Sequence, residues 1–129
     1  MSKTFPLKPG LYAIGDPAML IKKNAAGNVF ITTLWNTFYK KPNEFQEMII
    51  NGISLYMTRT LGGDGIFSGI GTDTGTIMII CIDDIQNDER FKFNLQQTFV
   101  KYMLVKEDEW VTVENFHIYF KNGFSIHTT

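Results

Sequence analysis

The stretch Thr76-Ile77-Met78-Ile79-Ile80-Cys81-Ile82 is almost wholly apolar. A short continuous apolar run bounded by turn signals is typical of a strand that is buried on both faces. We therefore expect residues 76–82 to form a central strand with a covering layer on each side. Asp83 and Asp84 end the run, and one of them is expected to cap a short helical turn beginning at Ile85.

The segment that precedes this run, Gly62 to Thr76, contains six glycines and two aspartates. Glycine permits positive φ and a close approach of other backbone, at an entropic cost on folding. So many glycines in fifteen residues indicate either demanding turns or a pocket lined by backbone.

Further strand signals lie on the N-terminal side. Leu11 to Ile14 is expected to form a first strand, and Met19–Lys22 with Val29–Thr33 a hairpin around residues 24–28. Between residues 34 and 48 the spacing of aromatic residues favours short helical pieces interrupted by Pro42, although Pro42-Asn43-Glu44 also fits the opening of a helix.

Asn51-Gly52 is the strongest hairpin signal, since both residues accept positive φ. The strand after it alternates, with Ile53, Leu55 and Met57 on one face.

The C-terminal third predicts a meander of strands over residues 98–105, 110–113, 116–120 and 124–127, with turns at 107–109 and at Asn122-Gly123. The expected fold class is α+β and predominantly antiparallel β. We expect a small sandwich or a partly open barrel of seven to nine strands, with one or two short helices.

Composition limits the classes of function. The 129 residues are the usual length of one domain, so we expect a single β-rich domain over residues 1–129. The net charge of −1 gives no general attraction to nucleic acid or to an anionic membrane. Cys81 is the only cysteine and is expected to be buried and unreactive. These features, together with the absence of a signal-like or membrane-spanning apolar run, predict a cytoplasmic protein.

No familiar catalytic pattern is present. A calcium-binding EF-hand loop starting at Asp64 would have Ile66 and Gly75 at ligand positions. The spacing after Gly63-Asp64-Gly65 does not fit a dinucleotide-binding loop, and no Gly-Lys pair exists for a phosphate-binding loop. His117 and His127 are possible cross-strand neighbours, but solvent exposure is the simpler interpretation of His117. We therefore predict no cofactor, no metal site and no catalytic residues.

The acidic turns give the candidate site. Aspartate beside glycine or proline usually bonds its own backbone amides, which is the simplest role for these residues. The alternative is that the turns gather at one end of the sheet and line a pocket, where glycine-loop amides would bind an anion and carboxylates a cation or a sugar hydroxyl. The candidate ligand-binding residues are Asp16, Gly63, Asp64, Gly65 and Asp73.

The order of several motifs resembles an uncharacterised family of small proteins from tailed bacteriophages and their bacterial hosts. The segment Gly10–Pro17 is similar to that family's Ile-Gly-Asp-Pro opening. It is followed in order by Trp35, by Gly63-Asp64-Gly65, by the Asp-x-Gly-x-Ile strand at residues 73–77 and by a glycine turn at residues 120–124. Ala18-Met19 replaces the family's usual Cys-Tyr. The resemblance implies a phage-like origin and a location in the host cytoplasm, and it brings no activity with it.

Two function hypotheses follow. The first is a non-enzymatic phage-type accessory protein that binds a host or viral protein or assembles with itself, since aromatic residues make up 14% of the chain and favour interfaces. The second is a protein that sequesters a small anionic ligand, such as a nucleotide signal of host defence. A hydrolase that uses Asp64 and Asp73 is a more distant third.

Overall fold

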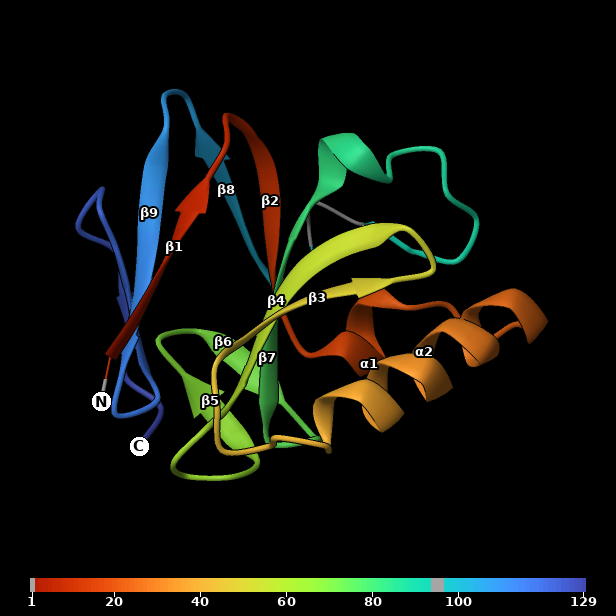
Figure 1. Cartoon of the computed structure of the whole chain (residues 1–129), viewed down its shortest axis with the longest axis horizontal. Helices are drawn as coiled ribbons and strands as arrows, with labels where there is room; N and C mark the ends of the chain where they lie inside the picture. The colour runs from red at the N-terminus through yellow and green to blue at the C-terminus, as the bar shows by residue number, and fades with distance from the viewer. Residues whose placement is uncertain (1, 94–96) are drawn as a thin grey trace.

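The computed structural model describes residues 2–93 and 97–129. They form two larger antiparallel sheets packed face to face, a separate two-stranded ribbon, and helices on the outer side of the five-stranded sheet (Figure 1). The larger sheet has the order β3-β4-β7-β2-β8, with β3 at Gln46–Ile50, β4 at Ile53–Arg59, β7 at Thr76–Cys81, β2 at Gly10–Gly15 and β8 at Lys101–Val105. The smaller sheet has the order β1-β9-β10-β11, with β1 at Ser2–Leu7, β9 at Glu109–Glu114, β10 at His117–Phe120 and β11 at Ser125–Ile126. The predicted class is confirmed, and the arrangement is a small α+β sandwich.

The central strand is β7, as the apolar run predicts. All six of its residues are buried. Ile77, Ile79 and Cys81 belong to the core between the two sheets, whereas Met78 and Ile80 belong to the core under the helices. A hydrogen-bonded turn begins at Ile85, as predicted, because the Ile85 carbonyl oxygen accepts from the Asp88 amide at 2.9 Å. The predicted cap is wrong, because Asp83 and Asp84 belong to the 3-10 helix η1 at Ile82–Asp84 and their carboxylates accept from the Leu11 amide and from Lys8. The two aspartates make contacts with the β1–β2 region instead.

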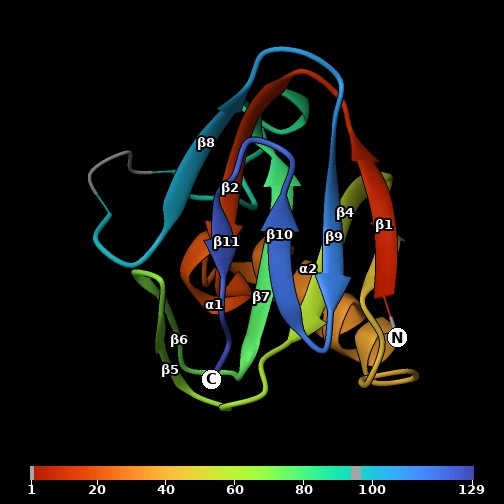
Figure 2. The same ribbon diagram turned by 90° about the vertical axis from the view of Figure 1, so that its left-hand side faces the viewer.

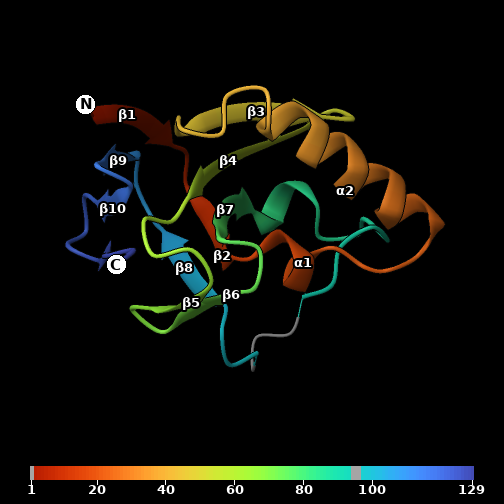
Figure 3. The same ribbon diagram turned by 90° about the horizontal axis from the view of Figure 1, so that it is seen from below.

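The predicted hairpin at residues 19–33 is also wrong, because this segment is helical. Helix α1 spans Pro17–Leu20 and α2 spans Ala25–Phe38, and both cover the outer face of the larger sheet (Figure 3). The run Asn-Ala-Ala-Gly-Asn has the composition of a turn, but Asn24 caps the N-terminus of α2, and its side chain accepts a hydrogen bond from the Gly27 amide. The helix is continuous and ends before Pro42, so the prediction of interrupted helical pieces and that of a helix opening at Pro42 both fail.

The Asn51-Gly52 turn is confirmed. Asn51 has a φ of 50° and Gly52 a φ of 82°, and the turn joins β3 to β4 with Ile50 opposite Ile53. Leu55 and Met57 point toward α2, as the alternation predicts, while Tyr56 points toward the smaller sheet.

The predicted C-terminal meander is divided between the two sheets. Strand β8 pairs with β2 in the larger sheet, whereas β9, β10 and β11 form the smaller sheet together with β1, and this smaller sheet faces the viewer in Figure 2. Sequence patterning predicts β8 to β11 and the turn at Gly123, which has a φ of 96°. It misses β1, a largely exposed strand that contains Pro6 and pairs along its whole length with β9. The described residues contain eleven strands, more than the seven to nine expected, because β1 and the ribbon of β5 (Gly65–Phe67) with β6 (Ile70–Thr72) were not anticipated.

Gly27 gives a test of the helical segment. Alanine in place of a helical glycine normally stabilises a protein by about 1 kcal/mol. Here a Cβ on Gly27 would overlap the carbonyl oxygen of Lys22, so Gly27→Ala should lower the free energy of unfolding, measured by urea denaturation. Asn28→Ala is the control, because Asn28 is exposed one residue later and should be neutral or stabilising. Stabilisation by Gly27→Ala would contradict this packing.

Candidate functional site

Asp16 forms a buried polar network at one end of the larger sheet. Its side chain is fully buried and accepts a hydrogen bond from the Ala18 amide at 2.9 Å, which caps α1. It also accepts bonds from the amides of Asp73, at 2.7 Å, and Thr74, at 3.2 Å. The hydroxyls of Thr72 and Thr74 complete the set at 3.1 and 3.0 Å. One carboxylate thus ties the start of α1 to the turn before β7.

The other predicted residues lie on the surface around this network. Asp64, Gly65 and Asp73 are exposed. The Gly63-Asp64 turn packs against Gly75, where a Cβ would lie 3.5 Å from Gly63 and 3.6 Å from the Asp64 carboxylate. The structure therefore brings the acidic turns to one end of the sheet, as the second interpretation requires. The amides of the 73–74 turn, however, donate to Asp16 and are not directed outward.

Asp16 should matter for stability more than its neighbours do. Asp16→Ala leaves buried amides and hydroxyls without an acceptor, so we expect a loss of about 2–4 kcal/mol in the free energy of unfolding. Asp73→Ala is the matched control, since its side chain is exposed and the substitution keeps the amide that bonds Asp16; its change should stay within about 0.5 kcal/mol. Equal losses from the two variants in urea denaturation would contradict the role assigned to Asp16.

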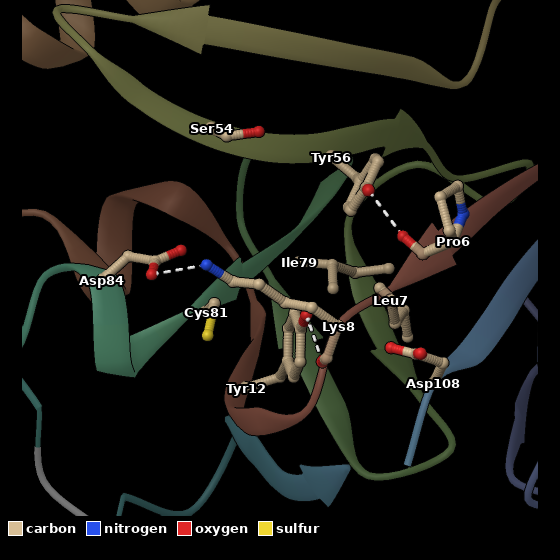
Figure 4. A pocket seen from close by; sticks show the side chains of 10 residues that line it. All are labelled: Pro6, Leu7, Lys8, Tyr12, Ser54, Tyr56, Ile79, Cys81, Asp84 and Asp108. Carbon is tan, nitrogen blue, oxygen red and sulfur yellow. Dashed lines mark hydrogen bonds and ion pairs between the residues drawn. The ribbon is translucent and has the colours of Figure 1, made fainter. Parts of the chain in front are cut away.

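A different part of the molecule offers a pocket. At the opposite end of β4 and β7, the sheets diverge around a cleft of about 350 Å³ (Figure 4). It lies between the β1–β2 connection, the inner faces of β4 and β7, and η1. The cleft is lined by Pro6, Leu7, Lys8, Tyr12, Ser54, Tyr56, Ile79, Cys81, Asp84 and Asp108. None of the predicted site residues is among them.

Three charged side chains border the cleft. The Lys8 side chain extends across it, and its Nζ lies 2.6 Å from Oδ1 of Asp84 (Figure 4). This hydrogen bond raises the pKa of Lys8, so the ammonium is charged throughout the physiological range. Asp108 is exposed, and its carboxylate has no partner among the described residues. The border of the cleft is therefore acidic overall.

The polar groups inside the cleft are held in their neutral forms. Tyr12 donates its hydroxyl to the Lys8 carbonyl oxygen at 2.9 Å, and Tyr56 donates to the Pro6 carbonyl oxygen at 2.7 Å. Burial raises the pKa of both phenols, that of Tyr56 to about 12. Burial also raises the pKa of the Cys81 thiol, which is 5% exposed. A protonated thiol and two protonated phenols are poor nucleophiles and bases, so this arrangement suits binding.

The sequence predicts strands β4 and β7 of this cleft, but it predicts neither β1, which supplies Pro6 and Leu7, nor the cleft itself. The alternation in β4 puts Tyr56 on the face opposite Leu55, and the apolar run identifies Cys81 as buried. Lys8 and Asp84 carry no motif, and their pairing depends on the fold joining residues 76 positions apart. The sequence does carry one signal for the cleft, because Tyr56 lies on the otherwise polar face of the alternating strand β4.

The two histidines lie near each other, with ring centroids 5.1 Å apart. Nδ1 of His117 accepts a hydrogen bond from the Thr128 amide at 3.0 Å, and His127 is exposed. Within the described part of the chain, no three His, Cys, Asp or Glu side chains are grouped so that they could hold a metal ion.

No protein-family model, curated protein or solved structure matches this chain. Across residues 2–93 and 97–129, none of the helices has the length and apolar character needed to cross a membrane.

The tyrosines predict a pH dependence of stability. An exposed phenol loses its proton near pH 10, whereas Tyr56 keeps its proton in the folded state up to about pH 12. Between these values the folded chain binds more protons than the unfolded chain, so stability must fall as pH rises. Urea denaturation between pH 8 and 11 should show this fall, with a shallower slope for Tyr56→Phe. Identical slopes in the two proteins would show that Tyr56 does not resist ionisation.

Proposed function

We propose that this protein acts by binding a partner protein, without chemistry of its own, through the cleft and the sheet face that adjoins it. The observation that carries the proposal is an uncovered strip of the larger sheet. The smaller sheet packs over β2, β7 and β8, and its edge strand β1 reaches β4, where Phe5 contacts the ring of Tyr56. Beyond that contact, the inward-facing Glu47, Ile49 and Ser54 of the β3–β4 hairpin are exposed. We call this surface the β3–β4 face, and it comprises Glu47, Ile49, Ser54 and Tyr56.

The β3–β4 face is apolar at its centre and continuous with the cleft. Ile49 is 74% exposed, the largest exposed fraction among the large hydrophobic side chains described as exposed. It lies directly opposite Ser54, which lines the cleft. Glu47 lies opposite Tyr56 in the same register. An apolar residue beside a concave pocket with a polar border matches the usual anatomy of a protein-binding surface.

The strand that presents this face is also the edge of the sheet. The order β3-β4-β7-β2-β8 leaves one side of β3 without a neighbouring strand. An extended segment of a partner can therefore add backbone hydrogen bonds at β3 while its side chains reach the face and the cleft.

The proposed biological setting is that of a phage-type accessory protein. It is supported by the order of the motifs from Gly10–Pro17 to the glycine turn at residues 120–124. In that setting the partner is a host or viral protein. Where the protein assembles with itself, the partner is a second copy of this chain, bound through the same edge strand.

The shape of the cleft favours one alternative, the capture of a small ligand. Its volume of about 350 Å³ lies in the range of small-molecule sites, and two tyrosine rings with one ammonium border it. A nucleotide signal of host defence would bind there by stacking of its base on a ring. Native mass spectrometry of the gently purified protein would then show a mass in excess of an integer number of chains.

Two matched substitutions test the docking surface. Ile49→Asp places a charge at the centre of the β3–β4 face, whereas Ile66→Asp places one at a similarly exposed site on β5, 62% exposed and at the other end of the molecule. With a photo-crosslinking residue at Ser54, we expect a discrete crosslinked partner, or a crosslinked dimer, that is lost in Ile49→Asp and kept in Ile66→Asp. Equal crosslinking in both variants, or none in the parent chain, would contradict the proposed surface.

A further inference from the structure

We propose that the cleft receives a cation on an aliphatic stem, namely the side chain of a lysine or arginine from the partner protein. This inference rests on the proposed function, because it names the chemistry by which the partner is recognised at that site.

The first observation is the charge of the cleft. Asp84 and Asp108 line it, and Lys8 is the one cation among its lining residues in the described chain. Lys8 is already paired with Oδ1 of Asp84, and Asp108 has no partner among residues 2–93 and 97–129. A bound cation would have Asp108 available, whereas a phosphate or carboxylate would face two carboxylates with a single ammonium that is already engaged.

The second observation is an unsatisfied carboxylate oxygen beside the cleft. Oε2 of Glu109 is buried and has no hydrogen-bond partner within the described part of the chain. Glu109 lies directly opposite Leu7 in the β1–β9 pairing, so the two side chains share the inner face of the sheet. Leu7 lines the cleft, as does Asp108, which precedes Glu109 in the chain. Glu109 does not itself line the cleft, so it places a third acidic side chain beside Asp108, behind the wall, and is not a direct contact of the bound cation.

The third observation is that the chain already places such a side chain in the cleft. The aliphatic stem of Lys8 crosses the cleft above Cys81, and its ammonium reaches Asp84 (Figure 4). The walls formed by Ile79, Tyr12 and Tyr56 suit an aliphatic stem, and aromatic rings attract cations. The side chain of Lys8 is 58% exposed, so a competing cation can reach and displace it. Lys8 therefore acts as an internal occupant that a partner's side chain replaces.

The test uses n-butylguanidinium as the probe and n-butylurea as its uncharged counterpart of similar shape. Chemical shifts of a ¹⁵N-labelled chain are followed during titration. We expect saturable shifts at Lys8, Tyr12, Cys81 and Asp84 with n-butylguanidinium, and much weaker ones with n-butylurea. Equal responses to the two probes, or stronger saturable shifts with inorganic phosphate, would overturn the inference.

Three variants sharpen the test. Asp108→Asn should weaken binding of n-butylguanidinium by roughly fivefold. Asp73→Asn, an exposed aspartate at the other end of the sheet, should leave it unchanged. Lys8→Ala should tighten binding, because it removes the internal competitor. Weaker binding by Lys8→Ala, or no effect of Asp108→Asn, would contradict the assignment, and the dispersed spectrum of each variant reports whether it is folded.

The outcomes separate this inference from the proposed function. If a partner is crosslinked through the β3–β4 face but neither Asp108→Asn nor excess n-butylguanidinium weakens its capture, the docking surface stands and the cation recognition is wrong. If the probe binds as described but no partner depends on Ile49, the cation site stands and the protein-binding function is wrong.

Discussion

The fold depends on one strand that is apolar on both faces. Because β7 exposes neither face to water, the chain must supply a cover on each side, and it supplies two different ones. Helices α1 and α2 cover the face that carries Met78 and Ile80, and the smaller sheet covers the face that carries Ile77 and Ile79. The larger sheet therefore separates the two cores. The smaller sheet can cover less of its face of the larger sheet without exposing the core under the helices.

The candidate site arises because the smaller sheet covers only part of its face of the larger sheet. The smaller sheet extends over β2 and β8 but leaves the inner face of β3 and part of β4 uncovered, which exposes Ile49 and opens the cleft beside Tyr56. Hydrogen bonds from the tyrosine hydroxyls to the carbonyl oxygens of Pro6, near the end of β1, and of Lys8, in the β1–β2 connection, hold the border of the cleft in place. Burial raises the pKa of the thiol and of both phenols, so these groups are protonated near neutral pH.

The sequence predicts the parts of the fold whose signals are local. The apolar run of β7 and the Asn51-Gly52 turn need no knowledge of the rest of the chain, and both are confirmed. The N-terminus of α2 was misread because Asn and Gly serve equally as turn residues and as a helix cap, and only the packing of Gly27 against Lys22 distinguishes the two. Strand β1 has little apolar character and exists because β9 offers it an edge. The acidic turns lie at one end of the larger sheet, but Asp16 is buried among amides and hydroxyls, in keeping with the simpler interpretation of these residues as turn and cap acceptors. The cleft lies elsewhere, and no spacing in the sequence reveals the pairing of Lys8 with Asp84 that crosses it.

The central claim is that a partner occupies the β3–β4 face and the adjoining cleft, and carbene footprinting of the free and partner-bound protein tests it most directly. Photoactivated carbenes label exposed side chains of any type, so Ile49 and Ser54 should be labelled in the free protein and protected in the complex. Ile66 and Val29, which are exposed elsewhere at 62% and 63%, should be labelled equally in both. Unchanged labelling of Ile49 and Ser54 in a complex that protects Ile66 or the glycine-rich turns would place the binding surface at the other end of the molecule and contradict the account.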